Sequence, residues 1–295
     1  MTKYAQKIGI TADCSSGLEY APFEHNVKIT RTTINFGNEV LIDGIDITAD
    51  EFYKRLEESD IIPSTAAPTI GEITRCIDEL KQAGCTDIIH FPISFGLSAY
   101  GETWQATLPE LFDDVNIHVV DTKRACILEG YQAFYAQKMA EAGYNTKEII
   151  KEIERLREQT GAFFVVDDLK YLVKNGRLSS VSGMIGSLVK IKPILELNQD
   201  GKISTYEKVR THTRALDRMI ELTLEKTKDA KKVLYYILHS NCLDGAKNLK
   251  SDFASKIKNA YQIDITTITP TVGAHIGSGV LGIGYVILDD IKIEL

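Results

Sequence analysis

The sequence predicts an α/β protein of two domains, with a doubly wound, mainly parallel sheet in residues 1–160 and a mixed α/β domain in residues 161–295. Three observations predict this architecture. Strand-like and helix-like segments alternate between residues 87 and 158, which is typical of a parallel sheet with right-handed crossovers. A hairpin pattern follows at 192–210, before further strands and helices. The length of 295 residues also favours two hydrophobic cores over one.

The composition is that of a globular protein without a nucleic-acid partner. Hydrophobic residues make up 44% of the chain, and the formal net charge is −7 with a pI near 5.5. A nucleic-acid-binding protein normally carries a basic face. No run of 18 apolar residues is present, and residues 1–7 lack the apolar core of a signal peptide. We therefore expect a cytoplasmic protein with no integral membrane segment.

The cysteines and histidines predict neither disulfides nor a metal site. The five cysteines are odd in number and form no C-x-x-C pair, and the six histidines are scattered. Cys76 and Cys126 lie in apolar segments and are most simply small core residues. We expect neither a metal nor a cofactor.

The first predicted strand, at 7–12, ends in a polar turn that begins with Asp13. Ligands of open α/β sheets bind at the carboxyl ends of strands, so Asp13 and Ser15 are candidates to contact one. An Asp side chain that bonds its own turn backbone explains the same residues equally well. Both interpretations stay open.

Three short strands are predicted next, in the order of a β-meander, at 27–30, 33–36 and 40–42. Each of them alternates apolar and polar residues or follows a turn. A helix is expected at 48–57, with Thr48 as its N-cap.

The segment 63–72 combines prolines with hydroxyl side chains and leads into a helix with apolar residues at positions 70, 73, 77 and 80. Thr69 and Glu72 have the spacing of a capping box. Capping leaves the hydroxyl of Thr65 without a structural task, near a helix N-terminus that favours an anion. Thr65 is therefore a candidate anion ligand.

A serine-rich turn, 94–98, joins a buried strand at 87–93 to the next predicted helix. A turn of this kind at a helix N-terminus can bind an anion through a serine hydroxyl. The alternative for Ser98 is a plain N-cap, worth about 1 kcal/mol.

The remaining elements continue the alternation. In the first domain we expect a strand at 117–121 and helices at 126–141 and 147–158. In the second domain we expect a short helix at 169–174, the hairpin, a helix near 211–228, a strand at 232–239, a helix near 243–261 and a strand at 264–269.

Five glycines surround His275 between residues 273 and 284. Glycines at this density permit positive φ and the close approach of another group. We expect a ligand-facing loop that enters a buried strand. A tight turn before an edge strand is the alternative.

The chain contains no GxxxxGK(S/T), HExxH or kinase signature, and no GxGxxG in the strand-turn-helix context of a nucleotide site. A hydrolytic triad of Ser98, His275 and Asp13 is conceivable, but the G-x-S-x-G elbow that would support it does not occur. A serine-type acyl hydrolase therefore stays open as an alternative function.

Motifs across nearly the whole chain resemble those of the DegV family. ITADCSS at 10–16 is similar to its D-S-x-S/T turn, STAAP at 64–68 to its T-S-Q-P loop, and SFGLS at 94–98 to its S-S-x-L-S-G-T loop. LVKNGRLS at 172–179 and IKPIL at 191–195 resemble the signature of its C-terminal domain. GAHIGSG at 273–279 resembles its terminal G-x-H-x-G-P-G loop.

The resemblance implies a lipid-binding protein without turnover of its own, which buries one long-chain fatty acid in an apolar tunnel between its two domains. It implies that the carboxylate is presented to a partner, a fatty acid kinase, for acyl-phosphate formation. Thr65, His275 and a serine of the 94–98 loop, Ser98 in preference to Ser94, would bind the carboxylate.

Two arginines acquire a role only through the resemblance. Arg177 and Arg210 would serve the kinase docking surface or support phosphotransfer. A lipid-responsive regulatory protein of the same fold is a further alternative.

The chain departs from the family motifs at three places. Ala66 replaces the second hydroxyl after Thr65, Ala99-Tyr100 replaces Gly-Thr after Ser98, and Ser278 replaces proline in the last loop. These departures bear on the ligand's identity and on the number of hydrogen bonds to its carboxylate.

Overall fold

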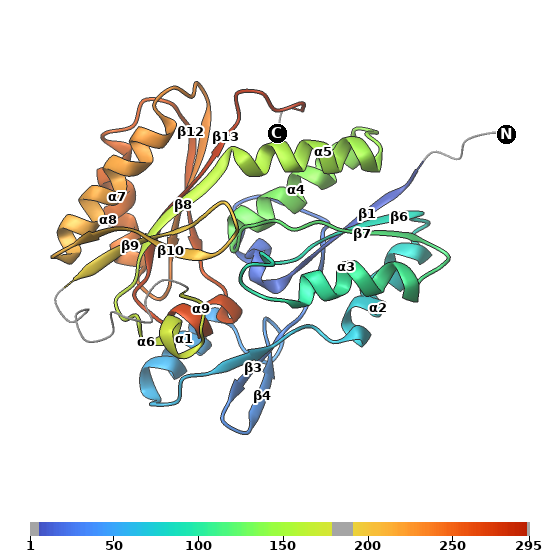
Figure 1. Ribbon diagram of the computed structural model, residues 1–295, viewed down its shortest axis with the longest axis horizontal. Coiled ribbons are helices and arrows are strands. Elements are labelled where there is room, and N and C mark those ends of the chain that lie inside the picture. Colours follow the sequence, from blue (N-terminus) through green and yellow to red (C-terminus); the bar gives the residue numbers. More distant parts are fainter. Residues whose placement is uncertain (1–5, 179–190, 294–295) are drawn as a thin grey trace.

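The computed structural model describes residues 6–178 and 191–293, whose strands form three sheets (Figure 1). A four-stranded parallel sheet forms the centre of one lobe, which we call the N-terminal lobe, and a six-stranded mixed sheet forms the centre of the C-terminal lobe. A three-stranded antiparallel sheet lies below the junction of the lobes in the view of Figure 1. The predicted α/β class, with a parallel sheet and a separate mixed sheet, is confirmed.

The parallel sheet has the spatial order β2 (Lys28–Thr30), β1 (Ile8–Asp13), β6 (Asp87–Phe91) and β7 (Asn116–Val119). Two 3-10 turns, η1 (Cys14–Ser16) and η2 (Leu18–Tyr20), follow β1. On one face, Ile88 belongs to a core shared with α2 (Ile70–Gln82) and α3 (Tyr100–Leu111). On the other face, Ile89 belongs to a core shared with α4 (Ile127–Glu141) and α5 (Thr146–Glu158). Helices on both faces explain why β6 is buried along its length, as a doubly wound sheet requires.

The mixed sheet has the spatial order β10 (Ile203–Val209), β9 (Lys192–Leu197), β8 (Thr160–Val165), β13 (Leu281–Ile287), β11 (Val233–His239) and β12 (Ala260–Thr267). Among these strands β11 and β12 pair in parallel and the other neighbours are antiparallel. The helices α7 (His212–Thr227) and α8 (Leu243–Ala254) cover one face, with which they share a core. The predicted hairpin is present as β9 and β10.

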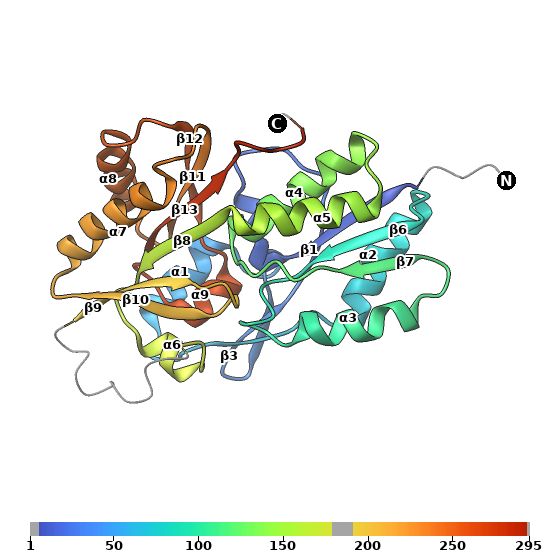
Figure 2. The same cartoon turned by 45° about the horizontal axis from the view of Figure 1, so that its top comes forward.

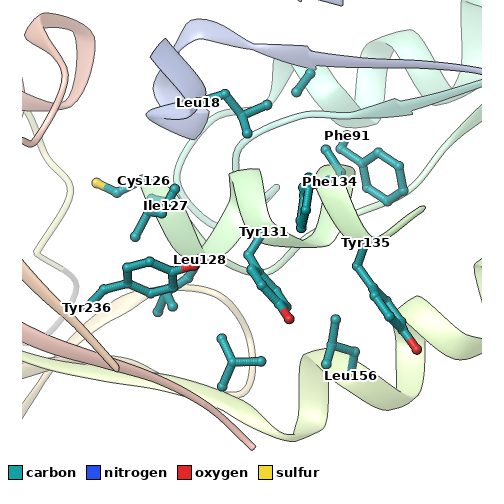
Figure 3. Packing of buried hydrophobic residues seen from close by; sticks show 14 of the residues in the cluster. Leu18, Phe91, Cys126, Ile127, Leu128, Tyr131, Phe134, Tyr135, Leu156 and Tyr236 are labelled. Atoms are coloured by element: carbon teal, nitrogen blue, oxygen red, sulfur yellow. The ribbon is translucent and has the colours of Figure 1, made fainter. Parts of the chain in front are cut away.

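Helix α4 joins the two lobes because it is buried around its whole circumference from Ile127 to Gln137. A helix that is buried all round must pack against neighbours on every side. Figure 3 shows Tyr131 and Leu128 of α4 beside Tyr236, which comes from β11 of the other lobe. One core therefore runs from the parallel sheet through α4 to the mixed sheet. The predicted boundary between residues 160 and 161 stays a prediction.

The small sheet consists of β4 (Glu39–Ile42), β3 (Thr33–Phe36) and β5 (Ser64–Ala66). It corrects the predicted meander, because β2 pairs with β1 in the parallel sheet and the third strand is β5, which the pattern did not indicate. The helices α1 (Ala49–Glu58) and α6 (Lys170–Lys174) lie nearby (Figure 2). A strand of three residues is too short to show alternation in the sequence.

The glycine-rich segment around His275 begins as a helix, α9 (Pro270–Ile276), and not as the expected loop. Thr269 accepts a hydrogen bond from Val272 N and Pro270 occupies the first turn, which are both favourable at a helix start. Gly277 ends the helix with φ of 82°. At Gly273 a Cβ would lie 2.6 Å from the Tyr53 hydroxyl oxygen, so the missing side chain lets α9 pack against α1.

Three smaller expectations were wrong. The capping box at Thr69 is half formed, because Thr69 accepts from Glu72 N while the Glu72 carboxylate pairs with Arg75 at 3.3 Å. Ser98 does not cap α3, which starts at Tyr100 without a side-chain cap. Helix α8 ends at residue 254, and the strand that follows starts at residue 260. Ser179 of the predicted signature lies outside the described residues.

Candidate ligand site between the lobes

A polar cavity lies where the small sheet, α9 and the carboxyl end of the parallel sheet meet. Its polar lining comprises Asp13, Ser15, Thr32, Thr65, Ser98, Tyr100, Arg177, Thr271 and His275. Thr65 comes from β5, Ser98 from the loop after β6, and His275 from α9. The three segments that the sequence singled out therefore converge on one cavity.

The small sheet places Thr65 opposite α9. Thr65 pairs with Ile34 of β3, so both side chains point to the same face of the sheet. Ile34 on that face is buried in a core that also contains Ala274 of α9. As a result Thr65 Oγ1 lies 2.8 Å from His275 Nε2.

The imidazole of His275 is neutral at neutral pH. Burial, with a smaller effect from the nearby Arg177 charge, lowers its pKa from 6.5 to about 4. Its Nδ1 is buried and has no hydrogen-bond partner within the described residues. If Nε2 donates to Thr65 Oγ1, the Thr65 hydroxyl can donate elsewhere, and if Nε2 accepts, Nδ1 carries a proton without a partner. Either tautomer leaves the pair with one unused donor.

Of the other predicted site residues, two line the cavity and two do not. Ser98 is half-buried in the cavity wall, and Arg177 lines the same wall while its Nε donates to Leu97 O at 3.3 Å. Ser94 is fully buried and is not part of the lining, because its Oγ donates to Gly201 O at 2.8 Å. Arg210 is exposed just after β10 and does not line the cavity.

A buried carboxyl pair forms the wall behind these residues. Asp13 accepts hydrogen bonds from Ser15 N at 2.7 Å, from Ile93 N at 3.0 Å and from the Tyr100 hydroxyl. Glu129 of α4 is also fully buried, and its Oε2 lies 2.9 Å from Ser15 Oγ. Burial and then the Asp13 charge raise the pKa of Glu129 well above its ordinary value. Asp13 thus bonds its own turn and also faces the cavity, which unites the two interpretations of the sequence.

A second buried carboxyl group supports α9. Asp43 accepts from Thr271 N at 2.9 Å and from Thr271 Oγ1 at 2.5 Å, and the Thr271 hydroxyl also contacts that of Thr32. Burial raises the pKa of Asp43 from 3.8 to about 6. Sequence reasoning missed Asp43, Thr32 and Glu129. A Glu inside the apolar helix segment was the one available signal.

An apolar cavity adjoins the polar one. Its lining is made entirely of apolar side chains and one thiol, from α4, α9, the strands of the mixed sheet and the loops beside them. Leu97, Ile203, Val272 and Ile276 line both cavities. The two cavities are therefore neighbours with a shared wall, and the polar side chains lie in the first while the lining of the second is apolar.

The geometry does not assemble a hydrolytic triad from the described residues. His275 pairs with Thr65 and not with Ser98, and Asp13 pairs with Ser15 and Tyr100. In the same part of the chain, no three His, Cys, Asp or Glu side chains are grouped to hold a metal ion. No helix there is both long and apolar enough to cross a membrane.

Comparison with known proteins agrees with the motifs. Residues 7–288 match the family model described as an uncharacterised protein of the DegV family. A DegV domain-containing protein of Staphylococcus aureus is 35% identical over 283 residues, covering 95% of this chain and 97% of the relative.

Two solved structures share the fold. The fatty acid binding DegV family protein from Streptococcus agalactiae superposes with a TM-score of 0.87 at 30% identity, over 96% of this chain and 100% of that one. DegV, a fatty acid binding protein from Bacillus subtilis, superposes with a TM-score of 0.86 at 27% identity, over the same shares of the two chains. The convergence of the motif residues, the family match and the shared fold lead to one conclusion: this chain belongs to the DegV family.

Proposed function

We propose that this protein binds one long-chain fatty acid, with its carboxylate at the polar end of the site and its acyl chain in the apolar cavity. The observation that carries the proposal is the adjacency of the two cavities, which share Leu97, Ile203, Val272 and Ile276 as lining residues. A molecule with one acidic end and a long apolar tail matches this division. The relatives from S. agalactiae and B. subtilis are described as fatty acid binding.

The polar end can bind a carboxylate mainly through neutral hydrogen-bond donors, with one positive charge nearby. The unused donor of the Thr65–His275 pair, the Ser98 hydroxyl and the Arg177 guanidinium line the same wall. Neutral donors with one cation orient a carboxylate and leave its second oxygen accessible. Ser94 is the least suited of the predicted ligands, because its hydroxyl is engaged by Gly201.

The apolar end supplies most of the affinity. Burial of each CH₂ group contributes about 0.8 kcal/mol, and the polar groups mainly fix the orientation of the ligand.

The finer part of the proposal is that the carboxylate is presented to a partner kinase for acyl-phosphate formation, so that the protein has no turnover of its own. Arg177 at the polar end and the exposed Arg210 are the positive charges we assign to that encounter. The test is ATP consumption by a fatty acid kinase on addition of this protein loaded with oleate. Arg210→Ala should lower that rate while oleate still binds, and an unchanged rate would remove Arg210 from the encounter.

Fatty acid binding itself is tested by native mass spectrometry of the purified protein incubated with oleate. We expect one added mass per chain, present in a smaller fraction of the molecules in the double variant Thr65→Val/His275→Phe. A wild-type protein that stays at its own mass would contradict the proposal. The alternative function, a serine-type acyl hydrolase, would be established if the protein hydrolysed nitrophenyl esters and Ser98→Ala abolished that activity. The pairing of His275 with Thr65 disfavours this alternative.

A further inference from the structure

The loop 94–98 of the N-terminal lobe is fastened to the C-terminal lobe at two points. Ser94 Oγ donates to Gly201 O at 2.8 Å, in the turn between β9 and β10. Arg177 Nε donates to Leu97 O at 3.3 Å. Ser94 is fully buried, so water does not compete for its hydrogen bond. This loop motif, which the sequence linked to the carboxylate, therefore makes its best-shielded contact with the opposite lobe.

Two glycines allow the contact. At Gly96 a Cβ would lie 2.7 Å from Asp200 O, and at Gly201 it would lie 1.9 Å from Ser94 Oγ. Gly201 also has a φ of 70°, which a residue with a side chain rarely adopts. Both clashes are with the partner segment, so the glycines serve the contact between the lobes.

The fastened segments lie at the boundary between the two cavities. Leu97 of the loop and Ile203, two residues after Gly201, both line the polar and the apolar cavity. Ile203 also forms a β-bridge with Leu178, the neighbour of Arg177. The contacts of Ser94 and Arg177 thus lie beside the residues that separate the polar end from the apolar end.

The apolar cavity has a volume of about 70 Å³. An apolar cavity of about 150 Å³ holds a single benzene molecule. A long acyl chain therefore requires the walls of this cavity to move apart, and those walls come from both lobes.

The loop is also held by its own lobe. Ser94 N donates to Arg124 O at 2.9 Å, and Phe95 N donates to Asp121 Oδ1 at 3.1 Å. If the lobes part, the loop is expected to stay with the N-terminal lobe, and the contacts of Ser94 and Arg177 are the ones that break.

We infer that the loop 94–98 and the turn 199–201 form a latch between the lobes, and that the fatty acid enters and leaves the apolar cavity when the latch opens. The inference rests on the proposed fatty acid binding. Ser94 is then a positioning residue that holds Leu97 at the boundary between the two cavities, and it does not bind the carboxylate.

The test is the rate at which oleate leaves the loaded full-length protein for excess phosphatidylcholine vesicles. Ser94→Ala should speed release about two- to tenfold, the range expected for loss of one hydrogen bond. Gly96→Ala should speed it more, because the new Cβ displaces the backbone of the turn. The matched controls are Ser204→Ala in the same hairpin and Gly71→Ala in α2, where a Cβ meets only ordinary contacts. Both controls should release oleate at the wild-type rate.

A second ligand separates a latch from a carboxylate contact. Oleyl alcohol has the same chain without the carboxylate, so a latch predicts the same acceleration by Ser94→Ala for the alcohol and for oleate. An effect on oleate alone would make Ser94 a carboxylate ligand and overturn the latch.

Hydrogen exchange of the protein without lipid gives a readout that does not depend on binding. The amides of residues 95–98 and 201–203 should exchange faster in Ser94→Ala than in wild type. Suppose that the wild-type protein binds oleate, but that either hydrogen exchange or oleate release is unchanged in both Ser94→Ala and Gly96→Ala. That result would overturn the latch and leave the proposed function standing. A wild-type protein that binds neither lipid would overturn the proposed function, and the latch as a lipid gate would fall with it.

Discussion

The two ends of the candidate site differ in how their atoms are engaged. At the polar end, Asp13, Asp43 and Thr271 already have hydrogen-bond partners inside the protein, and few donors remain for a ligand. At the apolar end the lining offers contact area without direction. Hydrogen bonds that are made within the protein are directional and fix its shape. Apolar contact has no preferred direction, and its favourable free energy grows with the apolar area of the ligand that is buried. The difference predicts that affinity follows the tail of the ligand and that orientation and pH behaviour follow its head.

The largest expected effect tests the apolar end by shortening the ligand. Four fewer CH₂ groups, from palmitate to laurate, should weaken binding by about 3 kcal/mol, which is about 200-fold. Titration calorimetry with saturated acids of increasing length checks this. Equal affinities for the two acids would show that the tail is not buried.

The next effect concerns the buried acid beneath the polar end. The folded-state pKa of Asp43, about 6, lies above its ordinary 3.8, so the neutral acid stabilises the fold below about pH 4 and this contribution is lost as the pH rises through about 6. Asp43→Asn lacks this titration. The stability of wild type relative to Asp43→Asn should therefore fall by about 2 to 3 kcal/mol between pH 4 and pH 7.

Urea unfolding at several pH values measures that difference. Asp244→Asn is the control, because its side chain is 95% exposed and should leave the profile unchanged. A pH-independent difference for Asp43→Asn would mean that folding does not raise the pKa of Asp43.

A smaller effect is expected at the Thr65–His275 pair. Thr65→Val keeps the shape of the side chain but removes its hydroxyl, and should weaken oleate binding by about 1 to 2 kcal/mol. Binding of oleyl alcohol should change much less. Thr33→Val, on the adjoining strand with its side chain on the opposite face, is the matched control. Loss of both ligands to the same extent would indicate damage to the small sheet and not to the carboxylate site.

The smallest effect is an expected constancy. His275 has a pKa of about 4, below its ordinary 6.5, so neutral His275 stabilises the fold above about pH 6.5 and this contribution is lost as the pH falls through about 4. Its imidazole should therefore show no titration between about pH 5.5 and pH 8 when followed by NMR of the ring carbon. A midpoint near 6.5 would show that the ring is solvated and that the polar end is open.

Much of the fold could be predicted from the sequence. The long helices and the buried strands have clear periodicity, and the alternation between residues 87 and 158 specified a parallel sheet. The third strand of the small sheet and the helix that contains His275 could not be predicted, because three residues show no period and five glycines suggest a loop. Both errors fall on segments that carry a proposed ligand contact.

The candidate site divides in the same way. Thr65, Ser98, His275 and Arg177 were found by motif and line one cavity, whereas Ser94 was found by motif and lies outside it. Loop sequence shows that a hydroxyl is present, but only the packing of the other lobe decides which side of the loop faces the ligand.

By itself the sequence determined the family, the order of helices and strands and the kinds of side chain at the site, because periodicity and motifs are local. The tertiary structure alone decided that Asp13, Glu129 and Asp43 are buried, and that Leu97 and Ile203 both line the two cavities. These residues are far apart in the chain, and their contacts, with the raised pKa values of Glu129 and Asp43, arise from the surroundings that the two lobes create jointly.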